Sequence, residues 1–188
     1  MKSIKNNINH TIIINKSKFI CYLIKINNEE EALSNLEKLK QEYKGATHYC
    51  YAYITGNIKR CSDDKEPSGT AGMPILNVLE NNDLTNILCV VIRYFGGIKL
   101  GAGGLVRAYS GCVSETLSKT EITDIYEGYK ITIEFDYDKV KFIDNLLKEY
   151  EIIKKDFNNK INYTFLVKKD DYNKISNLNI IKKEDILI

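Results

Sequence analysis

The sequence predicts an α+β protein built from two domains, residues 1–124 and 125–188. Apolar residues alternate along some segments, which is typical of strands, and recur every three or four positions along others, which is typical of helices. A chain of 188 residues is long enough for two small domains. Composition supports the division, because all three arginines, both prolines and all eleven glycines lie between residues 45 and 128.

The first domain is predicted to begin with a strand and a helix. Residues 10–26 are rich in β-branched and aromatic residues and are interpreted as one strand. Residues 27–45 follow as a helix, with three glutamates in its first turn, where they complement the helix dipole. Residues 47–55 form the next strand, in which His48 and every second residue share one face and three tyrosines share the other.

A loop, a short helix, a strand and a long helix complete this domain. Residues 56–72 are rich in Gly, Ser, Asp and Pro and predict a loop, and Pro74 suits the first turn of a helix. Residues 86–94 are the most apolar segment and are expected to be a central strand. A glycine-rich turn at residues 96–104 then leads into a helix with an apolar stripe over residues 105–117.

The second domain is predicted to follow the β-α-β-β-α-β order of the ferredoxin-like pattern. Its lysines and its acidic residues number 12 each, so it is neutral overall. The predicted elements are a strand at 129–135, a helix at 140–150, strands at 151–157 and 161–167, a short helix at 170–178 and a last strand.

Composition narrows the class of protein. The formal net charge of +2 excludes a protein that coats nucleic acid by overall charge, but it allows a local basic patch. Five cysteines without a CxxC pair argue against a zinc ribbon or a disulfide scaffold, and predict free thiols in the cytoplasm. We expect no signal peptide, and the longest aliphatic run, residues 87–92, is too short to span a membrane.

The first candidate functional feature is the strand segment THYCYAY, residues 47–53. Its tyrosines and His48 could stack on bases or bind a ligand. Tyrosines also suit any half-buried sheet surface, so packing is the simpler interpretation for them, whereas His48 remains a candidate ligand residue.

The second feature is an acidic loop, residues 62–72. Its candidate ligand residues are Asp63, Asp64, Glu66, Ser68, Gly69 and Thr70. The three carboxylates could hold Mg²⁺ or supply a general base, but the alternating ligands of an EF-hand are missing, so no metal site is predicted. The competing interpretation is a structural loop, in which at least one carboxylate pairs with an arginine or with backbone N–H groups.

The third feature is a glycine-rich segment, residues 93–109, with the sequence RYFGGIKLGAGGLVRAY. Glycines just before a helix expose backbone N–H groups at its positive end, which is suited to binding an anion. The segment matches neither the P-loop nor the GxGxxG pattern. The residues expected to bind phosphate or RNA are Arg60, Arg93, Lys99, Gly101, Gly103, Gly104 and Arg107.

Three segments together resemble the IMPACT family, in its two-domain bacterial branch: ATHYCYAY, SDDKEPSGTAGMPILNVLE and VIRYFGGIKLGAGGLVRAYSGCVSE. The resemblance covers nearly the whole chain. It implies a first domain like the second domain of the fifth small-subunit ribosomal protein, an α/β sandwich with a left-handed βαβ crossover. It implies a second domain like domain V of elongation factor G. It brings no established reaction, catalytic residue or cofactor, and none is predicted.

Eukaryotic relatives of this family regulate translation by binding the activator of a nutrient-sensing kinase. The favoured interpretation is therefore a cytoplasmic protein that binds RNA or the ribosome and modulates translation or its stress regulation. The alternative is a small enzyme acting on a phosphorylated or nucleotide substrate, with phosphate at the glycine-rich segment and Mg²⁺ or a base at the acidic loop. A third interpretation is a module that binds a protein partner in the same groove.

Overall fold

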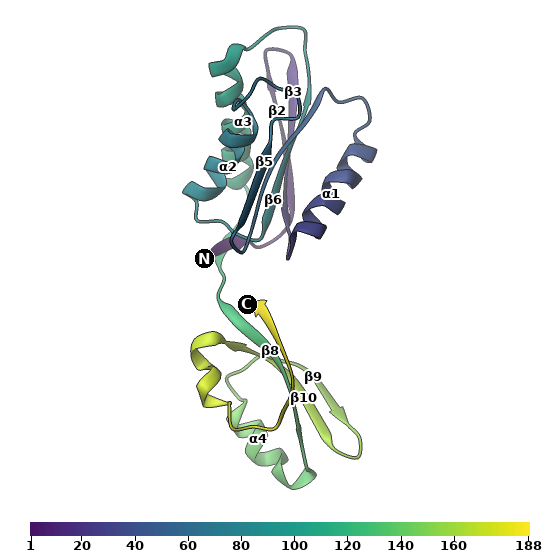
Figure 1. Ribbon diagram of the computed structural model, residues 1–188, viewed down its shortest axis with the longest axis vertical. Helices are drawn as coiled ribbons and strands as arrows, with labels where there is room; N and C mark the ends of the chain where they lie inside the picture. The colour runs from purple at the N-terminus through teal and green to yellow at the C-terminus, as the bar shows by residue number, and fades with distance from the viewer. The chain divides into compact units, whose positions relative to one another are not determined.

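The computed structural model describes residues 1–188, which divide into two compact units, Met1–Asp124 and Ile125–Ile188 (Figure 1). Each unit has its own sheet and its own apolar core. Both units combine helices with strands, which confirms the predicted α+β class. None of the helices is both long enough and apolar enough to cross a membrane.

A five-stranded antiparallel sheet forms the centre of the first unit, in the order β2-β3-β6-β4-β5. Its strands are β2 (Ile8–Ile14), β3 (Ser17–Lys25), β4 (His48–Thr55), β5 (Ile58–Ser62) and β6 (Ile87–Tyr94). The prediction that β6 is central is confirmed, and all of its residues except Tyr94 are buried. A separate two-stranded ribbon pairs β1 (Lys2–Ile4) with β7 (Ile122–Asp124).

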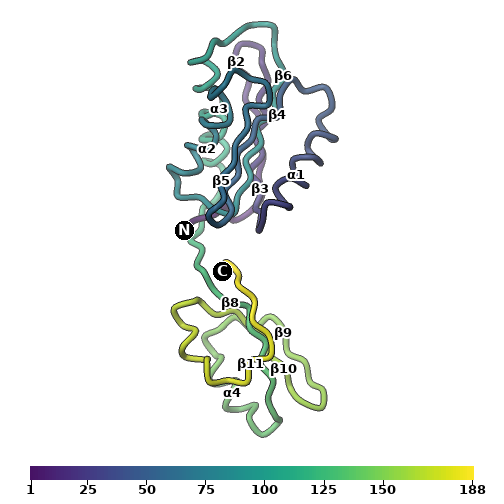
Figure 2. The backbone as a smooth tube through the Cα atoms, in the orientation of Figure 1, coloured from purple at the N-terminus to yellow at the C-terminus, as the bar shows by residue number.

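Helices cover both faces of this sheet (Figures 1 and 2). Helix α1 (Glu29–Glu42) packs on one face, and α2 (Gly72–Asn81) and α3 (Gly101–Leu117) pack on the other. Successive side chains of β4 point to opposite faces of the sheet and contribute to the apolar cluster on each face. Cys50 faces α2 and α3, whereas Tyr53 lies beneath α1. The tyrosines of β4 therefore pack against α1.

The two crossovers of this sheet differ in hand. β3-α1-β4 and β5-α2-β6 each join parallel strands that have one strand between them. The two crossovers run across the sheet in opposite directions, between strands of opposite polarity, and their helices lie on opposite faces. Each of these three reversals changes the hand, so one crossover is left-handed, although right-handed crossovers are the general rule.

Two predictions for the first unit were wrong. Residues 10–26 form a hairpin instead of one strand, because Asn15 and Lys16 adopt left-handed conformations with φ of 46° and 65°. The Asn-Lys pair does not carry the Asn-Gly signal of such turns. The predicted loop at 56–72 contains β5, whose polar residues belong to an edge strand and therefore look like loop sequence.

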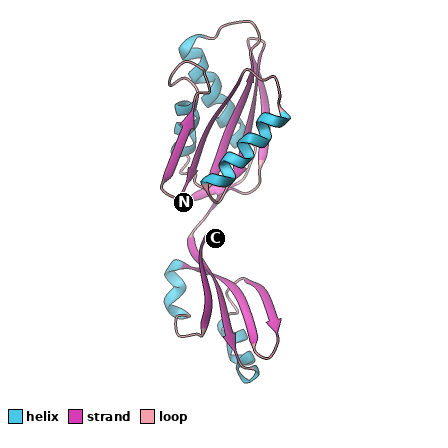
Figure 3. Cartoon of the chain, turned by 45° about the vertical axis from the view of Figure 1, so that its right-hand side comes forward, coloured by secondary structure: helices cyan, strands magenta, loops and turns pink.

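The second unit is a four-stranded antiparallel sheet in the order β11-β8-β10-β9, with its helices drawn in cyan in Figure 3. Its elements are β8 (Glu127–Phe135), the 3₁₀-helix η1 (Tyr137–Lys139), α4 (Val140–Leu146), β9 (Ile152–Phe157), β10 (Ile161–Lys168), the 3₁₀-helix η2 (Lys169–Lys174) and β11 (Ile180–Leu187). Strands and helices follow one another along the chain in the predicted β-α-β-β-α-β order. The first helix is shorter than predicted, and the second is a 3₁₀-helix.

Candidate functional site

Three loops of the first unit meet at one end of its sheet. Gly96 lies so close to the β2–β3 turn that a Cβ atom there would be 2.0 Å from the carbonyl carbon of Lys16. His48 opposes Arg93 across β4 and β6, and its Nδ1 lies 2.8 Å from the carbonyl oxygen of Asp64. The turn at 15–17, the acidic loop and the glycine-rich segment are therefore neighbours.

Asp63 shapes the acidic loop. Its carboxylate accepts hydrogen bonds from the backbone N–H groups of Gly69, Ala71 and Gly72, at 2.8, 2.9 and 2.8 Å. Burial raises the pKa of Asp63, but these three hydrogen bonds lower it by more, so the net pKa lies below the ordinary value. Asp63 therefore caps the start of α2 as a carboxylate, and both of its oxygens are occupied.

The other polar groups of the loop are also used internally. Asp64 Oδ2 accepts a hydrogen bond from the backbone N–H of Tyr49 at 2.6 Å. The hydroxyl of Thr70 donates to the carbonyl of Pro67 at 2.6 Å. Ser68 is exposed, and Gly69 has a φ of 74°, a conformation that favours glycine. The loop is shaped by its own side chains, as in the structural interpretation.

A buried ion pair lies behind this loop. Glu66 Oε1 accepts a hydrogen bond from Arg93 Nη1 at 2.5 Å and another from the Tyr109 hydroxyl at 2.8 Å. The side chains of Arg93 and Glu66 are only 5% and 4% exposed. His48 Nε2 lies 3.7 Å from the same oxygen, which is beyond hydrogen-bonding distance. Arg93 is thus neutralised inside the fold and unable to reach a phosphate, contrary to the prediction.

No activated nucleophile accompanies the ion pair. The thiol of Cys50 contacts the Tyr109 hydroxyl at 3.3 Å. Burial raises the pKa of Cys50 and also the pKa of Tyr109, so both groups keep their protons at neutral pH. No group of three or more His, Cys, Asp or Glu side chains is arranged to hold a metal ion.

The glycine-rich segment differs in detail from the predicted turn. Helix α3 already begins at Gly101, so Gly103 and Gly104 lie in its first turn, and the left-handed conformations fall at Gly97 and Gly101. Leu100 at the N-cap position offers no side-chain acceptor to the first N–H groups of the helix. The sequence lacks a Ser, Thr, Asp or Asn cap that would have marked this start.

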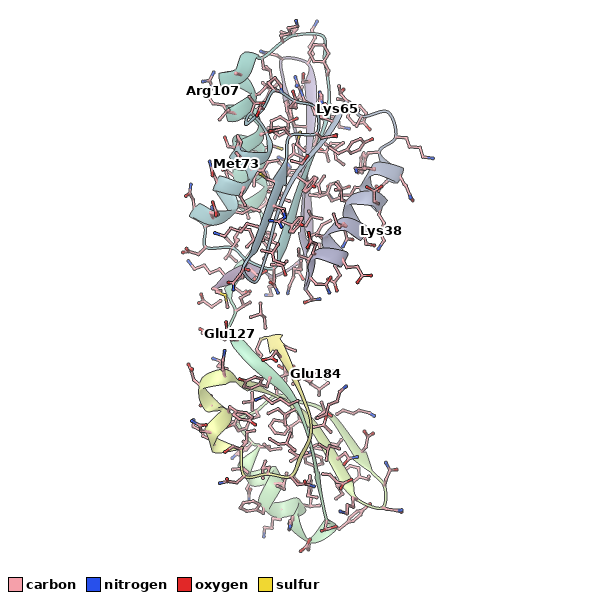
Figure 4. The ribbon with its side chains drawn as sticks, in the orientation of Figure 1. Lys38, Lys65, Met73, Arg107, Glu127 and Glu184 are labelled. Carbon is pink, nitrogen blue, oxygen red and sulfur yellow. The ribbon has the colours of Figure 1, made fainter.

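Exposed cations surround this end of the sheet, and we call them the basic rim. The basic rim consists of Lys16, Lys18, Lys65, Lys99 and Arg107. None of them has a carboxylate within ion-pair distance; the carboxylates of the neighbouring acidic loop are turned toward backbone N–H groups or Arg93. A Cβ atom on Gly103 would lie 3.7 Å from Arg107 Nη1, which places this cation beside the first turn of α3. Figure 4 labels Lys65 and Arg107 in this part of the unit.

Arg60 does not join the basic rim. It lies in β5 opposite Tyr53, and Tyr53 is five positions from His48 along β4, so Arg60 is remote from the end of the sheet where the three loops meet. Its Nη1 donates to the carbonyl of Lys59. Its position alternates with that of Cys61, which packs toward α2 and α3, so Arg60 belongs to the α1 side of the sheet.

Sequence reasoning missed several members of this site. The helical periodicity places Tyr109 in the apolar stripe of its helix, and the signal for its second role is that a buried tyrosine hydroxyl needs a hydrogen-bond partner. Ser17 was assigned to a strand interior, yet its Oγ accepts from the backbone N–H of Gly96 at 3.1 Å. The sequence pattern assigns no role to Phe95, and 46% of its surface is exposed in the structure.

Replacing Asp63 with asparagine is expected to lower the free energy of unfolding by about 1.5–3 kcal/mol at pH 7, because hydrogen bonds to a charged acceptor are lost. Since the folded pKa is depressed, the carboxylate stabilises the fold above its unfolded pKa of about 3.9. The difference between wild type and variant should vanish as the pH falls through the folded pKa. Urea unfolding at several pH values measures this difference in the free energy of unfolding. Asp170→Asn, at an exposed position, is the control. An equal loss of stability in both variants would contradict the capping role of Asp63.

Comparison with known proteins identifies relatives over most of the chain. The Impact N-terminal domain model matches residues 15–117. The IMPACT family member YvyE of Bacillus subtilis is 42% identical over 159 residues, which cover 83% of this chain and 73% of YvyE. The IMPACT family member YigZ of Escherichia coli is 36% identical over 151 residues, which cover 77% of this chain and 74% of YigZ.

A solved structure is similar over almost the full length. It is a crystal structure of a hypothetical protein, and its sequence is 28% identical to this chain. The two structures superpose with a TM-score of 0.68, and the match covers 97% of each chain. The domain match includes the acidic loop, β6 and the glycine-rich segment, which carried the resemblance seen in the sequence. The chain therefore belongs to the IMPACT family.

Proposed function

We propose that this protein is a cytoplasmic modulator of translation that binds RNA, including RNA of the ribosome, through the basic rim of its first unit. The observation that carries the proposal is the asymmetry of charge at this end of the sheet. Five cations are exposed without ion pairs, whereas the three carboxylates between them are held by backbone N–H groups or by Arg93. Such a surface attracts phosphates even though the net charge of the whole chain is only +2.

The start of α3 supports the same proposal. Its first-turn N–H groups have no side-chain cap, and Lys99 and Arg107 flank them. Backbone N–H groups at a helix start and nearby cations together favour a phosphate. We further propose that the first unit resembles the second domain of the fifth small-subunit ribosomal protein and that the second unit resembles domain V of elongation factor G. A shared fold does not by itself establish a function, so the basic rim remains the main support for RNA binding.

The enzyme alternative has less support. Its Mg²⁺ or general base was expected at Asp63, Asp64 and Glu66, and all three carboxylates already have partners within the protein. Cys50 and Tyr109 keep their protons, so neither offers a nucleophile.

Neutralising two cations of the basic rim is expected to weaken RNA binding for all sequences alike. Wild-type affinity for a fluorescent single-stranded RNA should fall with salt at a slope that corresponds to about two to four released ions, at roughly 0.7 per phosphate contact. The double variant Lys99→Ala/Arg107→Ala should reduce that slope by about 1.4. Fluorescence anisotropy at several salt concentrations measures both quantities.

Lys38→Ala is the matched control, because Lys38 is also exposed and unpaired but lies on α1 (Figure 4). It should leave affinity and slope unchanged. Equal losses in the control and the double variant, or no binding of RNA by the wild type at low salt, would refute the proposed interface.

A further inference from the structure

We propose that Phe95 is a stacking platform for an unpaired base, so that the ligand of the basic rim is single-stranded RNA. This inference rests on the proposed function and specifies its ligand. Phe95 directly follows β6 and remains 46% exposed, although a phenylalanine gains free energy by burial. An exposed aromatic ring bordered by cations is the arrangement that single-stranded nucleic acid binds.

Phe95 is the outer end of a column that reaches into the core. The Arg93 guanidinium lies over the Phe95 ring, 5.5 Å from its centroid, and over the Phe19 ring at 5.2 Å. Phe19 is fully buried. A base on the free side of Phe95 would extend this Phe19–Arg93–Phe95 column by one more planar group.

The column is fixed before any ligand arrives. Arg93 is held by Glu66 at 2.5 Å and contacts Ser17 Oγ at 3.4 Å. The backbone N–H of Phe95 donates to Thr47 Oγ1 at 3.0 Å, and the N–H of Gly96 donates to Ser17 Oγ at 3.1 Å. The backbone at Phe95 and Gly96 and the Arg93 guanidinium beside the ring are thus held in place, so ordering this segment adds little to the entropy cost of binding.

Exposed lysines precede and follow the platform along the folded chain. Lys16 borders Gly96 in the adjoining turn. Lys18 opposes Tyr94 and alternates with Phe19, so it lies on the α1 side of the sheet, away from the Phe95 ring. Lys99 follows on the same segment, and none of these lysines has an ion pair. Phosphates on either side of a stacked base would meet the charges of Lys16 and Lys99. A base inside a duplex cannot reach the ring, because its own neighbours already cover both of its faces.

The experiment uses the full chain and two probes, a fluorescent oligoadenylate of about 12 nucleotides and an RNA duplex of similar length. Phe95→Leu keeps an apolar side chain but removes the aromatic face. It should weaken binding of the single strand by about 5- to 150-fold, the range of one base-stacking contact. The salt slope should stay unchanged, because no phosphate contact is lost.

Phe95→Tyr provides the rescue, because tyrosine keeps the ring, and it should bind within about twofold of the wild type. Thermal melting of each variant verifies the fold. Equal affinity of wild type and Phe95→Leu, failure of Phe95→Tyr to retain affinity, or equal binding of duplex and single strand would overturn the platform while leaving RNA binding intact. Absence of any RNA binding by the wild type would overturn both proposals.

Discussion

Replacing Glu66 with leucine is expected to lower the free energy of unfolding by about 3–5 kcal/mol, the cost of leaving one partner of a buried ion pair uncompensated. Arg93 would keep its charge in a place where only 5% of the side chain is exposed. Its remaining polar neighbour, Ser17 Oγ at 3.4 Å, cannot neutralise that charge. Urea denaturation followed by circular dichroism measures the loss.

The double variant Glu66→Leu/Arg93→Met separates the charge from the packing. Replacing both partners with apolar side chains of similar volume removes the unpaired charge, so much of the lost stability should return. A double variant as unstable as Glu66→Leu would show that packing or the Tyr109 hydrogen bond dominates instead of the charge.

Replacing Gly96 with alanine is expected to be equally damaging for a steric reason. The new Cβ would lie 2.0 Å from the carbonyl carbon of Lys16, 2.1 Å from its oxygen and 2.4 Å from the nitrogen of Ser17. All three are backbone atoms of a tight turn, so no side-chain rotation relieves the overlap. We expect a loss at or above the upper end of the roughly 1–3 kcal/mol that overpacking usually costs.

Gly111→Ala is the matched control for Gly96→Ala. Gly111 lies within α3, and a Cβ there would meet no atom within 4 Å. Alanine in a helix is favoured over glycine by about 0.5–1 kcal/mol, so this variant should be slightly more stable than the wild type. Thermal unfolding distinguishes the two, and a mild effect of Gly96→Ala would mean that the β2–β3 turn moves away freely.

Local patterns predicted the fold better than the boundaries between its elements. The alternation of β4 and the continuous apolar run of β6 are direct consequences of burial on one or both faces. The β2–β3 turn was missed because its two residues, Asn15 and Lys16, lack the Asn-Gly or Asp-Gly pattern that is typical of a two-residue hairpin turn.

For the candidate site, the sequence indicated which residues matter better than it indicated what each of them does. Unusual composition led to Asp63, Glu66 and Arg93, which do come together at one end of the sheet. The capping role of Asp63 uses backbone N–H groups of its own loop, in agreement with the structural interpretation of that loop. The buried pair depends on partners that are distant in sequence, because Arg93 and Tyr109 lie 27 and 43 positions from Glu66. Spacing along the chain carries no information about these distant partners of Glu66.

The central position of β6 also governs the order in which this protein can fold during synthesis. The hairpins β2–β3 and β4–β5 precede β6 in the chain, yet β3 and β4 both need β6 as their neighbour. A nascent chain that ends before residue 87 therefore presents two open strand edges, each with apolar residues. Only when β6 inserts do both edges close, and α3 follows to cover one face. Until then the open apolar edges favour aggregation of the emerging chain.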